Sequence, residues 1–269
     1  MPELPEVETV RRSLLPIIGR RIEAVEVYEA RLRRVLSADF AHRLTGSVIE
    51  AIERRGKYLV FRLAGGSAVL AHLGMSGALL LQSLDVPRQT HDHVRLRLAG
   101  GVQLTFNDPR RFGLLRVGRI EDFEELCNVG PDPLDGSFGI DTLAALTHGR
   151  KKPVKNLLMD QRALGGIGNI YANEILFRAR IRPGRQARRL TRAELARLLE
   201  ATRAVLSSAI RLGGSSISDY RDGTGKPGYF QLRLRVYDRA GKPCRRCGTG
   251  VRRTVHAGRS SFYCPMCQR

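Results

Sequence analysis

The spacing of hydrophobic positions changes along the chain and divides it into stretches with different expected structures. After Pro5, apolar residues recur at helical intervals as far as Gly19, which predicts an amphipathic helix. From Ile22 to Val117, apolar and polar positions alternate as they do in half-buried strands. A turn at Gly100 and Gly101 joins two of these segments as a hairpin, so this stretch is expected to form a β-sandwich or barrel.

The second half of the chain has a mainly helical pattern. Residues 121–149 are rich in turn signals and predict a crossing region between two domains. Thr191 and Glu194 have the spacing of a capping box, in which each side chain satisfies a backbone N–H of the other residue. A long helix is therefore expected to begin there and to end at Gly213 and Gly214.

The last part of the chain is expected to hold a loop and short strands. Residues 213–228 are rich in glycine and serine and have no hydrophobic period, which predicts a loop. Short strands are predicted at Leu232–Tyr237 and near Phe262, where apolar positions alternate again around the cysteines.

The charge of the chain is concentrated in its second half. The formal net charge is +20, yet residues 1–149 hold 19 Lys and Arg against 19 Asp and Glu, whereas residues 150–269 hold 27 against 7. Such a surface repels itself unless a polyanion neutralises it, and nucleic acid is the usual polyanion. The charge distribution therefore indicates a nucleic-acid-binding half.

Several protein classes are excluded by what the sequence lacks. No apolar run is long enough to span a bilayer, and the start of the chain has none of the sections of a secretion signal. Four of the five cysteines form two CxxC pairs, which is the pattern of a metal site in a reducing compartment and not that of a disulfide framework. We therefore expect a cytoplasmic protein.

The cysteine pairs have the spacing of a zinc ribbon. Cys244 and Cys247 are separated from Cys264 and Cys267 by 16 residues, and each pair can place two thiolates around a tetrahedral metal. Four protein ligands leave no open position for a reactive water, so one structural Zn²⁺ is expected. A thioredoxin-like redox pair is disfavoured because the βαβ context is missing. Cys127 is expected to be an inert core residue.

The first residues of the chain carry a second chemical signal. Removal of Met1 exposes Pro2 as a secondary amine, and a terminal amine titrates near pH ~8, so part of it is nucleophilic at neutral pH. Its condensation with a sugar aldehyde gives an iminium cation, which acts as an electron sink. Glu3 is placed to transfer protons in such a reaction. Proline and acidic residues are also ordinary at a helix N-terminus, so the pair alone does not establish catalysis.

Taken together, the motifs resemble one family almost from end to end, the bacterial formamidopyrimidine-DNA glycosylases, which excise oxidised purines such as 8-oxoguanine. The matching segments are Pro2–Thr9, Arg55–Lys57, His72–Gly77, Asn107–Gly113, Gly166–Glu174, Asp222–Phe230 and the four-cysteine finger. The resemblance implies a multidomain α+β fold with DNA bound between the halves. The implied parts are a catalytic β-sandwich domain at 2–120, the crossing region at 121–149, a helix-two-turns-helix DNA-binding domain at 150–228 with a lesion loop at 213–228, and a zinc-ribbon finger at 229–269.

The resemblance also implies the catalytic residues. Pro2 is similar to the nucleophile that attacks C1′ of the damaged nucleotide, and Glu3 to the acid that assists base release and ring opening. The iminium then promotes β- and δ-elimination, so the implied enzyme is a bifunctional DNA glycosylase and AP lyase without a nucleotide cofactor. Lys57 resembles a phosphate-contacting proton donor, a role that suits lysine because its pKa is adjustable. Arg259 resembles the finger arginine that grips phosphates beside the lesion.

Other residues resemble the family's DNA contacts. Met75, Arg110 and Phe112 are similar to the three residues that fill the space left by an extruded nucleotide. The remaining matches to DNA-contacting positions are His91, Arg150, Lys155 and Asn169. Asn169 follows a glycine-rich turn at the start of a predicted helix, where backbone N–H groups favour a phosphate. The segment Asp219–Tyr229 corresponds to the loop that covers the lesion.

Two other functions remain open at this level. A sister glycosylase for oxidised pyrimidines has a similar architecture, although its N-terminal motif typically has glycine where this chain has Leu4. A zinc-dependent DNA-binding protein without catalysis explains the charge and the cysteines but leaves Pro2 and Glu3 unexplained. The expected partner is damaged double-stranded DNA, bound by a monomer that does not associate with membranes.

Overall fold

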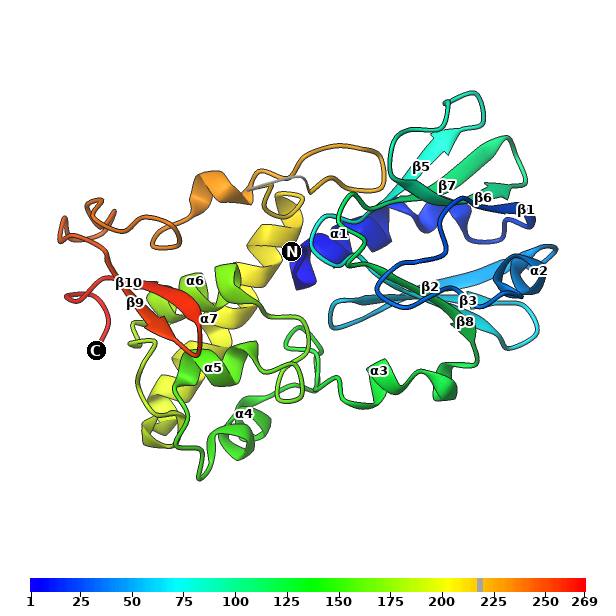
Figure 1. Ribbon diagram of the computed structural model, residues 1–269. Helices are drawn as coiled ribbons and strands as arrows, with labels where there is room; N and C mark the ends of the chain where they lie inside the picture. Colours follow the sequence, from blue (N-terminus) through cyan, green and yellow to red (C-terminus); the bar gives the residue numbers. More distant parts are fainter. Residues whose placement is uncertain (217–219) are drawn as a thin grey trace. The chain divides into compact units, whose positions relative to one another are not determined.

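The computed structural model of the protein describes residues 1–216 and 220–269. Contacts divide the chain into two compact units (Figure 1). The first unit consists of Met1–Cys127 and Leu212–Gln231, and the second of Asn128–Arg211 and Leu232–Arg269. The segment Leu212–Gln231 thus makes its contacts with the N-terminal part of the chain. The domain boundaries expected from the sequence remain predictions.

The first unit begins with the predicted amphipathic helix, α1 (Leu4–Ser13). A short 3₁₀ turn, η1 (Leu15–Ile17), follows it, and the chain leaves the helical region at Gly19 with φ +83°. Val7 and Val10 are buried on the inner face of α1. Their burial against the sheets fixes the position of the helix, whose N-terminal end carries the first residues of the chain.

Two antiparallel four-stranded sheets make up most of the first unit, with strand orders β1-β6-β7-β5 and β2-β3-β4-β8. The strands are β1 (Ile22–Val27), β2 (Ile49–Arg55), β3 (Tyr58–Leu63), β4 (Ala68–His72), β5 (Ala78–Ser83), β6 (Asp92–Leu98), β7 (Val102–Asn107) and β8 (Leu114–Gly118). One apolar core contains side chains of both sheets and of α1, so the predicted sandwich is confirmed. The hairpin across Gly100 and Gly101 joins β6 to β7, as the alternation predicts.

Short helices cover the remaining surfaces of the first unit. They are α2 (Phe40–Leu44), η2 (Ile120–Asp122) and α3 (Glu124–Cys127). Phe123 packs against the outer face of the second sheet with Val60, Leu70 and Leu114. The expectation that Cys127 is a core residue is wrong: Cys127 is exposed at the end of α3, and Phe123, just before that helix, takes the buried position.

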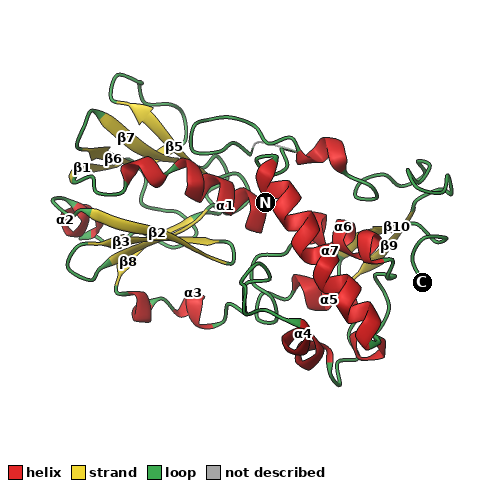
Figure 2. Cartoon of the chain, turned by 180° about the vertical axis from the view of Figure 1, so that it is seen from behind, coloured by secondary structure: helices red, strands yellow, loops and turns green. Residues whose placement is uncertain are grey.

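The second unit is helical apart from its C-terminal hairpin. Its helices are α4 (Ile140–Thr147), α5 (Val154–Met159), α6 (Asn169–Ala179), η3 (Ala187–Arg189), α7 (Arg192–Arg211) and η4 (Phe230–Arg233), the last of which straddles the boundary between the units. The long helix α7 packs against α6 and α4 (Figure 2). The predicted capping box at its start is confirmed, since Glu194 N donates to Thr191 Oγ1 and Thr191 N donates to a Glu194 carboxylate oxygen.

The C-terminal finger contains one hairpin, β9 (Arg252–His256) paired with β10 (Arg259–Tyr263). The strand predicted near Phe262 is therefore confirmed, whereas the strand predicted at Leu232–Tyr237 is wrong. The backbone N–H groups of Arg235, Val236 and Tyr237 donate to the carboxylate of Glu174 and pair with no strand. The multidomain α+β fold class is confirmed. None of the helices in the described part of the chain has the length and hydrophobicity that crossing a bilayer requires.

Candidate functional site

The first residues of the chain are held in a buried position at the start of α1. Pro2 is buried, and Glu3, only 4% exposed, is the N-cap of the helix. The backbone N–H of Glu3 donates a 2.9 Å hydrogen bond to Oε2 of Glu6. Both carboxylates therefore lie at the N-terminal end of α1, which carries a partial positive charge.

The environment of the chain terminus favours a neutral amine. Burial lowers the pKa of the Met1 amino group below its usual range, while the negative charges of Glu3 and Glu6 oppose this change. Lys57 and Arg110 lower the same pKa further by charge repulsion. Lys57 is itself buried in the turn between β2 and β3. The structure therefore brings Pro2, Glu3, Lys57 and Arg110 to one region of the first unit.

Glu6 links this region to the segment Leu212–Gln231. Its Oε1 accepts a 2.7 Å hydrogen bond from the backbone N–H of Ser215, and its carbonyl oxygen accepts one of 3.2 Å from the hydroxyl of Tyr220. Gly214, at φ +82°, approaches so closely that a Cβ there would lie 2.9 Å from Glu6. Ile217–Asp219 of the predicted lesion loop lie outside the described residues.

Two neighbouring loops of the first unit expose large side chains at their tips. Met75, on the loop between β4 and β5, is 42% exposed, and Phe112, on the loop between β7 and β8, is 46% exposed. The guanidinium of Arg110 lies 4.8 Å from the centre of the Phe112 ring. The three residues that the sequence suggests as a filling set thus lie on these two loops, with Met75 and Phe112 exposed at their tips.

Two histidines shape the turns around these loops. His72 Nδ1 accepts a 2.9 Å hydrogen bond from the backbone N–H of Gly74, and its ring packs against Tyr58. Burial lowers the pKa of His72 to about 4, and the charges of Arg33 and Lys57 act in the same direction. His91 is exposed in the turn before β6, with φ +71°.

A pocket of the second unit contains two of the predicted phosphate contacts. Asn169 is the first residue of α6, and Arg259 is the first residue of β10. Both line a pocket of about 460 Å³ together with Tyr237 and Arg253. Asn169 at the start of α6 and the two arginines Arg253 and Arg259 therefore line one pocket, an arrangement that suits an anion.

Buried polar groups hold the walls of this pocket. Glu174 accepts the three backbone N–H groups around Tyr237, and burial raises its pKa despite these bonds. Asn173 accepts a 2.7 Å hydrogen bond from the backbone N–H of Phe262 on β10 and donates to the carbonyl of Asn169. Helix α6 therefore positions Tyr237, Asn169 and the finger hairpin from one face.

The two remaining predicted DNA contacts lie in different settings. Lys155 is fully buried on α5, and its Nζ donates 2.6 and 2.8 Å hydrogen bonds to Ser260 O and Ser261 Oγ at the start of β10. It supports the hairpin that carries Arg259 and does not lie on an exposed surface. Arg150 is exposed after α4.

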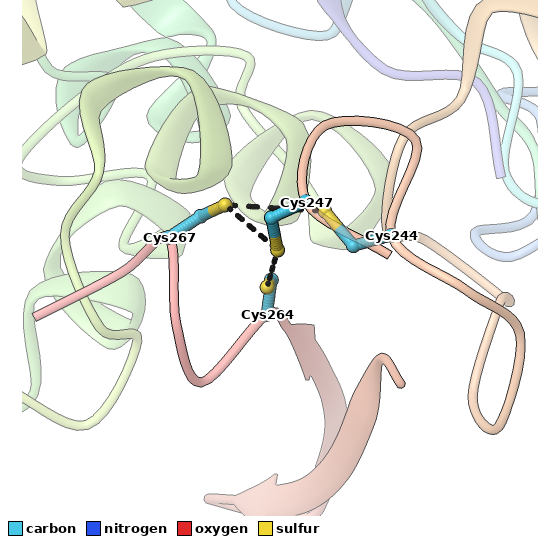
Figure 3. Close-up of side chains that lie close together, drawn as sticks. All are labelled: Cys244, Cys247, Cys264 and Cys267. Atoms are coloured by element: carbon cyan, nitrogen blue, oxygen red, sulfur yellow. Dashed lines mark hydrogen bonds between the residues drawn. The ribbon is translucent and has the colours of Figure 1, made fainter. Parts of the chain in front are cut away.

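The four finger cysteines meet at one point (Figure 3). All four sulfur atoms lie within 4.8 Å of one another, with 3.4 Å between Cys247 and Cys264 and 4.0 Å between Cys244 and Cys267. Sulfur atoms at the corners of a tetrahedral zinc–thiolate site are about 3.8 Å apart, so the cluster fits one tetrahedral metal ion. Hydrogen bonds from Thr249 lower the pKa of Cys247 to about 6, whereas burial raises the pKa of Cys264 and of Cys267. Without a cation at their centre the four thiols therefore do not all ionise, and a bound metal would favour the thiolate form.

The sequence analysis singled out most of the residues described above but missed three that contact them or line the same pocket. Glu6, Asp108 and Tyr237 were not singled out, although all three contact predicted site residues or line their pocket. Glu6 stood within the N-terminal motif, and Tyr237 ended the strand that was expected at Leu232–Tyr237. Glu6 and Asp108 lie within segments that match the family, whereas Tyr237 lies in none of them. Their contacts with Ser215, Ser76 and the pocket at α6 join segments that are far apart in the sequence.

Family models match most of the chain. The formamidopyrimidine-DNA glycosylase N-terminal domain matches residues 1–115, and the formamidopyrimidine-DNA glycosylase H2TH domain matches residues 129–221. A zinc finger found in FPG and IleRS matches residues 241–269.

Full-length relatives and solved structures agree with these matches. The formamidopyrimidine-DNA glycosylase of Alkalilimnicola ehrlichii is 48% identical over 278 residues, with 100% of both chains covered. The crystal structure of MutM (FPG) from Thermus thermophilus has a TM-score of 0.88 at 43% identity, covering 99% of this chain and 98% of that one. The complex of Lactococcus lactis FPG (MutM) with a Fapy-dG containing DNA has a TM-score of 0.89 at 34% identity, covering 99% of this chain and 100% of that one.

Proposed function

The chain belongs to the formamidopyrimidine-DNA glycosylase family, and we propose that it excises oxidised purines from duplex DNA and then nicks the abasic site. It is a DNA glycosylase of base-excision repair, and 8-oxoguanine and formamidopyrimidines are the proposed lesions. The observation that carries the proposal is the full-length family match together with Pro2 and Glu3 at the buried start of α1.

In the proposed reaction, Pro2 acts as the nucleophile once Met1 has been removed. Its nitrogen forms a bond to C1′ as the bond between C1′ and the base breaks. Opening of the bond between C1′ and O4′ then leaves an iminium between Pro2 and the sugar, and O4′ takes a proton. Burial lowers the pKa of the Met1 amino group at this site, and the same surroundings would favour a neutral, nucleophilic Pro2 nitrogen once Met1 is removed.

Glu3 is proposed to give its proton to the departing base, to take up the proton that the Pro2 nitrogen loses after attack, and to pass that proton to O4′ as the ring opens. The iminium acidifies C2′, so loss of a C2′ proton expels the 3′ phosphate, and a second elimination expels the 5′ phosphate. Lys57, buried near the terminus, is proposed to contact a phosphate and to donate a proton during elimination. These steps release the base and two phosphate-ended strands, and water then hydrolyses the iminium to free the sugar fragment and restore the Pro2 amine, without a nucleotide cofactor.

The DNA contacts are proposed from the two loops and the pocket. Met75, Arg110 and Phe112 would fill the space of the extruded nucleotide, since their tips are exposed in the free protein. Asn169 and Arg259 would bind phosphate in the pocket at the start of α6. His91 and Arg150 are proposed as further DNA contacts at exposed positions. Lys155 is buried, and we propose that it acts by supporting the hairpin that carries Arg259.

The metal of the cysteine cluster is proposed to be one Zn²⁺. Cys244, Cys247, Cys264 and Cys267 would complete its coordination, so the ion stabilises the finger and takes no part in the chemistry. We further propose that the protein acts as a monomer on damaged DNA in the bacterial cytoplasm, where the chromosome lies.

Borohydride trapping tests the proposed function. A duplex with one 8-oxoguanine is incubated with the protein and borohydride, which reduces an iminium to a stable adduct. We expect a covalent product whose peptide map places the DNA on Pro2, and little product with a duplex carrying an oxidised pyrimidine. A Glu3→Gln variant should still bind the duplex but release no base. The absence of an adduct at Pro2 would reject the proposal in favour of a non-catalytic DNA-binding protein.

A further inference from the structure

The loops that carry Met75 and Phe112 are fastened to each other by one buried carboxylate. Asp108 is fully buried after β7, and its Oδ1 accepts a 2.7 Å hydrogen bond from the hydroxyl of Ser76. Its Oδ2 accepts another 2.7 Å hydrogen bond from the backbone N–H of Gly113. A single side chain therefore joins the loop that follows β4 to the loop that precedes β8.

The backbones of these two loops touch at a glycine. Gly74 has φ +61°, and a Cβ there would lie 2.4 Å from the carbonyl carbon of Phe112. Gly113 is equally restricted, because its Cβ would lie 2.5 Å from the Phe106 ring and 3.0 Å from Asp108 Oδ2. Only glycine permits both approaches, so the loops are held at a fixed separation.

Ser76 lies between the carboxylate and the third tip residue. The backbone N–H of Arg110 is 3.3 Å from Ser76 Oγ and 3.3 Å from Asp108 Oδ1. A hydroxyl has one proton, and a carboxylate can only accept, so Ser76 donates to Asp108 and accepts from Arg110. The hydroxyl thus ties the Met75 loop to Arg110 as well as to Asp108.

We propose that Ser76 and Asp108 form a latch that fixes Met75 to Arg110 and Phe112, so that the three tips enter the base stack as one rigid wedge. This inference rests on the proposed function. Exposed side chains on independent loops lose conformational freedom when they are inserted, and this loss weakens insertion. Loops that are already joined in the free protein lose less. Ser76 and Asp108 are positioning residues, because neither of them is one of the three tip residues that enter the stack.

A tryptophan reporter can follow insertion of the wedge directly. The chain contains no tryptophan, so a Phe112→Trp variant carries a single fluorophore, whose emission is quenched when it stacks between bases. In this background Ser76→Ala removes the hydroxyl, and Ser76→Thr keeps it. Ser76→Cys, a close match in size with a weak S–H donor, provides a second variant if the alanine variant does not fold.

The expected results separate positioning from folding. Ser76→Ala should lower excision of 8-oxoguanine from duplex about tenfold, or ~1.4 kcal/mol, the order expected for one lost hydrogen bond to a charged group. Ser76→Ala should also remove most of the fluorescence quench that accompanies duplex binding. Ser76→Cys should show a smaller loss of excision and of quenching, and Ser76→Thr should retain both. Trapping on a single-stranded abasic oligonucleotide should not change, because no stack has to be filled there.

A matched control is available at the other end of β5, the strand that follows Ser76. Ser83 donates to the carboxylate of Asp85 beyond the other end of β5, in a hydroxyl–carboxylate pair like that of Ser76. Ser83→Ala should leave excision and quenching unchanged.

The outcomes distinguish the two proposals. If the wild-type protein forms no adduct with abasic DNA, the proposed function fails. If the Phe112→Trp parent forms the adduct but the alanine and cysteine variants keep the quench and duplex excision, the latch is wrong. Equal losses on duplex and single-stranded substrates would also overturn the latch, because they would indicate general damage to the site.

Discussion

The carboxylate of Glu6 accepts a 2.7 Å hydrogen bond from the backbone N–H of Ser215, although 209 residues separate the two in the sequence. The other oxygen of Glu6 accepts a 2.9 Å hydrogen bond from the backbone N–H of Glu3. One buried side chain therefore connects the residues proposed for catalysis with the segment proposed to cover the lesion. Movement of that segment is expected to affect the position of the nucleophile.

A Glu6→Gln variant tests this connection. The amide has one acceptor oxygen where the carboxylate has two, so either Glu3 or Ser215 faces an N–H donor instead of an acceptor. An unsatisfied buried donor costs about 1–3 kcal/mol, so excision should fall by roughly one to two orders of magnitude. Single-turnover excision of 8-oxoguanine measures the effect. Glu50→Gln, an exposed position on β2, is the matched control. Unchanged excision by Glu6→Gln would show that the connection has no catalytic consequence.

The proposed nucleophile requires the removal of Met1. With Met1 attached, the nitrogen of Pro2 belongs to an amide, whose lone pair is delocalised and not nucleophilic. Protein produced with an inhibitor of peptide deformylase keeps a formylated Met1 and has the same sequence otherwise. Intact mass identifies the two forms, and only the processed form is expected to give a borohydride adduct. Equal adduct from the form that keeps Met1 would eliminate Pro2 as the nucleophile.

His72 should make stability depend on pH. Its pKa is lowered from 6.5 in the unfolded chain to about 4 in the folded protein, so between these values the unfolded state binds more protons. The free energy of unfolding therefore decreases as the pH falls through this window, in total by about 3 kcal/mol. His72→Asn places an amide oxygen near the position of Nδ1, which can accept the Gly74 N–H without titrating. Urea unfolding between pH 7.5 and pH 4 should show a steeper loss of unfolding free energy for the parent than for His72→Asn. The same dependence on pH in both proteins would contradict the role assigned to His72.

The sequence predicted those features whose determinants are close together along the chain. The capping box of Thr191 and Glu194, the hairpin at Gly100 and Gly101, and the pairs of cysteines each depend on residues within a few positions of one another. Alternation also predicted many of the buried positions of the two sheets, although Val27 is exposed and β4 is buried at every position. Local spacing was sufficient in these cases because a local interaction stabilises the element.

The sequence could not predict contacts between distant segments. Leu232–Tyr237 alternates like a strand, but its N–H groups donate to Glu174 on α6, so the carboxylate replaces the partner strand. Nothing near Glu174 indicates this role. The bond from Ser76 to Asp108 is hidden for the same reason, since it spans 32 residues and depends on the pairing of β5 with β7. Such residues become recognisable only when the folded backbone brings them together.

The pocket at the start of α6 predicts a specific salt dependence. If Arg259 binds a phosphate, Arg259→Ala should weaken binding of damaged and undamaged duplex alike and reduce the slope of log affinity against log salt by about 1. Arg252→Ala removes the same charge from the same hairpin, but Arg252 does not line the pocket. Its effect on the slope should be smaller. Equal slopes for the two variants would indicate that the pocket has no phosphate of its own.

Removal of the metal should unfold the finger. Cys244 and Cys264 are both ligand candidates and members of the small apolar cluster of the finger, so loss of the ion leaves few other contacts to hold the β9–β10 hairpin. We expect a chelator to produce an additional unfolding transition at lower temperature and to abolish duplex binding. Added Zn²⁺ should remove that transition and restore binding.

Cys247→Ser should reduce the zinc content, whereas Cys127→Ser, which changes the cysteine outside the cluster, should keep one zinc per chain. Full zinc content in Cys247→Ser would contradict a four-cysteine site. Duplex binding that survives metal removal would instead show that the finger contributes little to affinity.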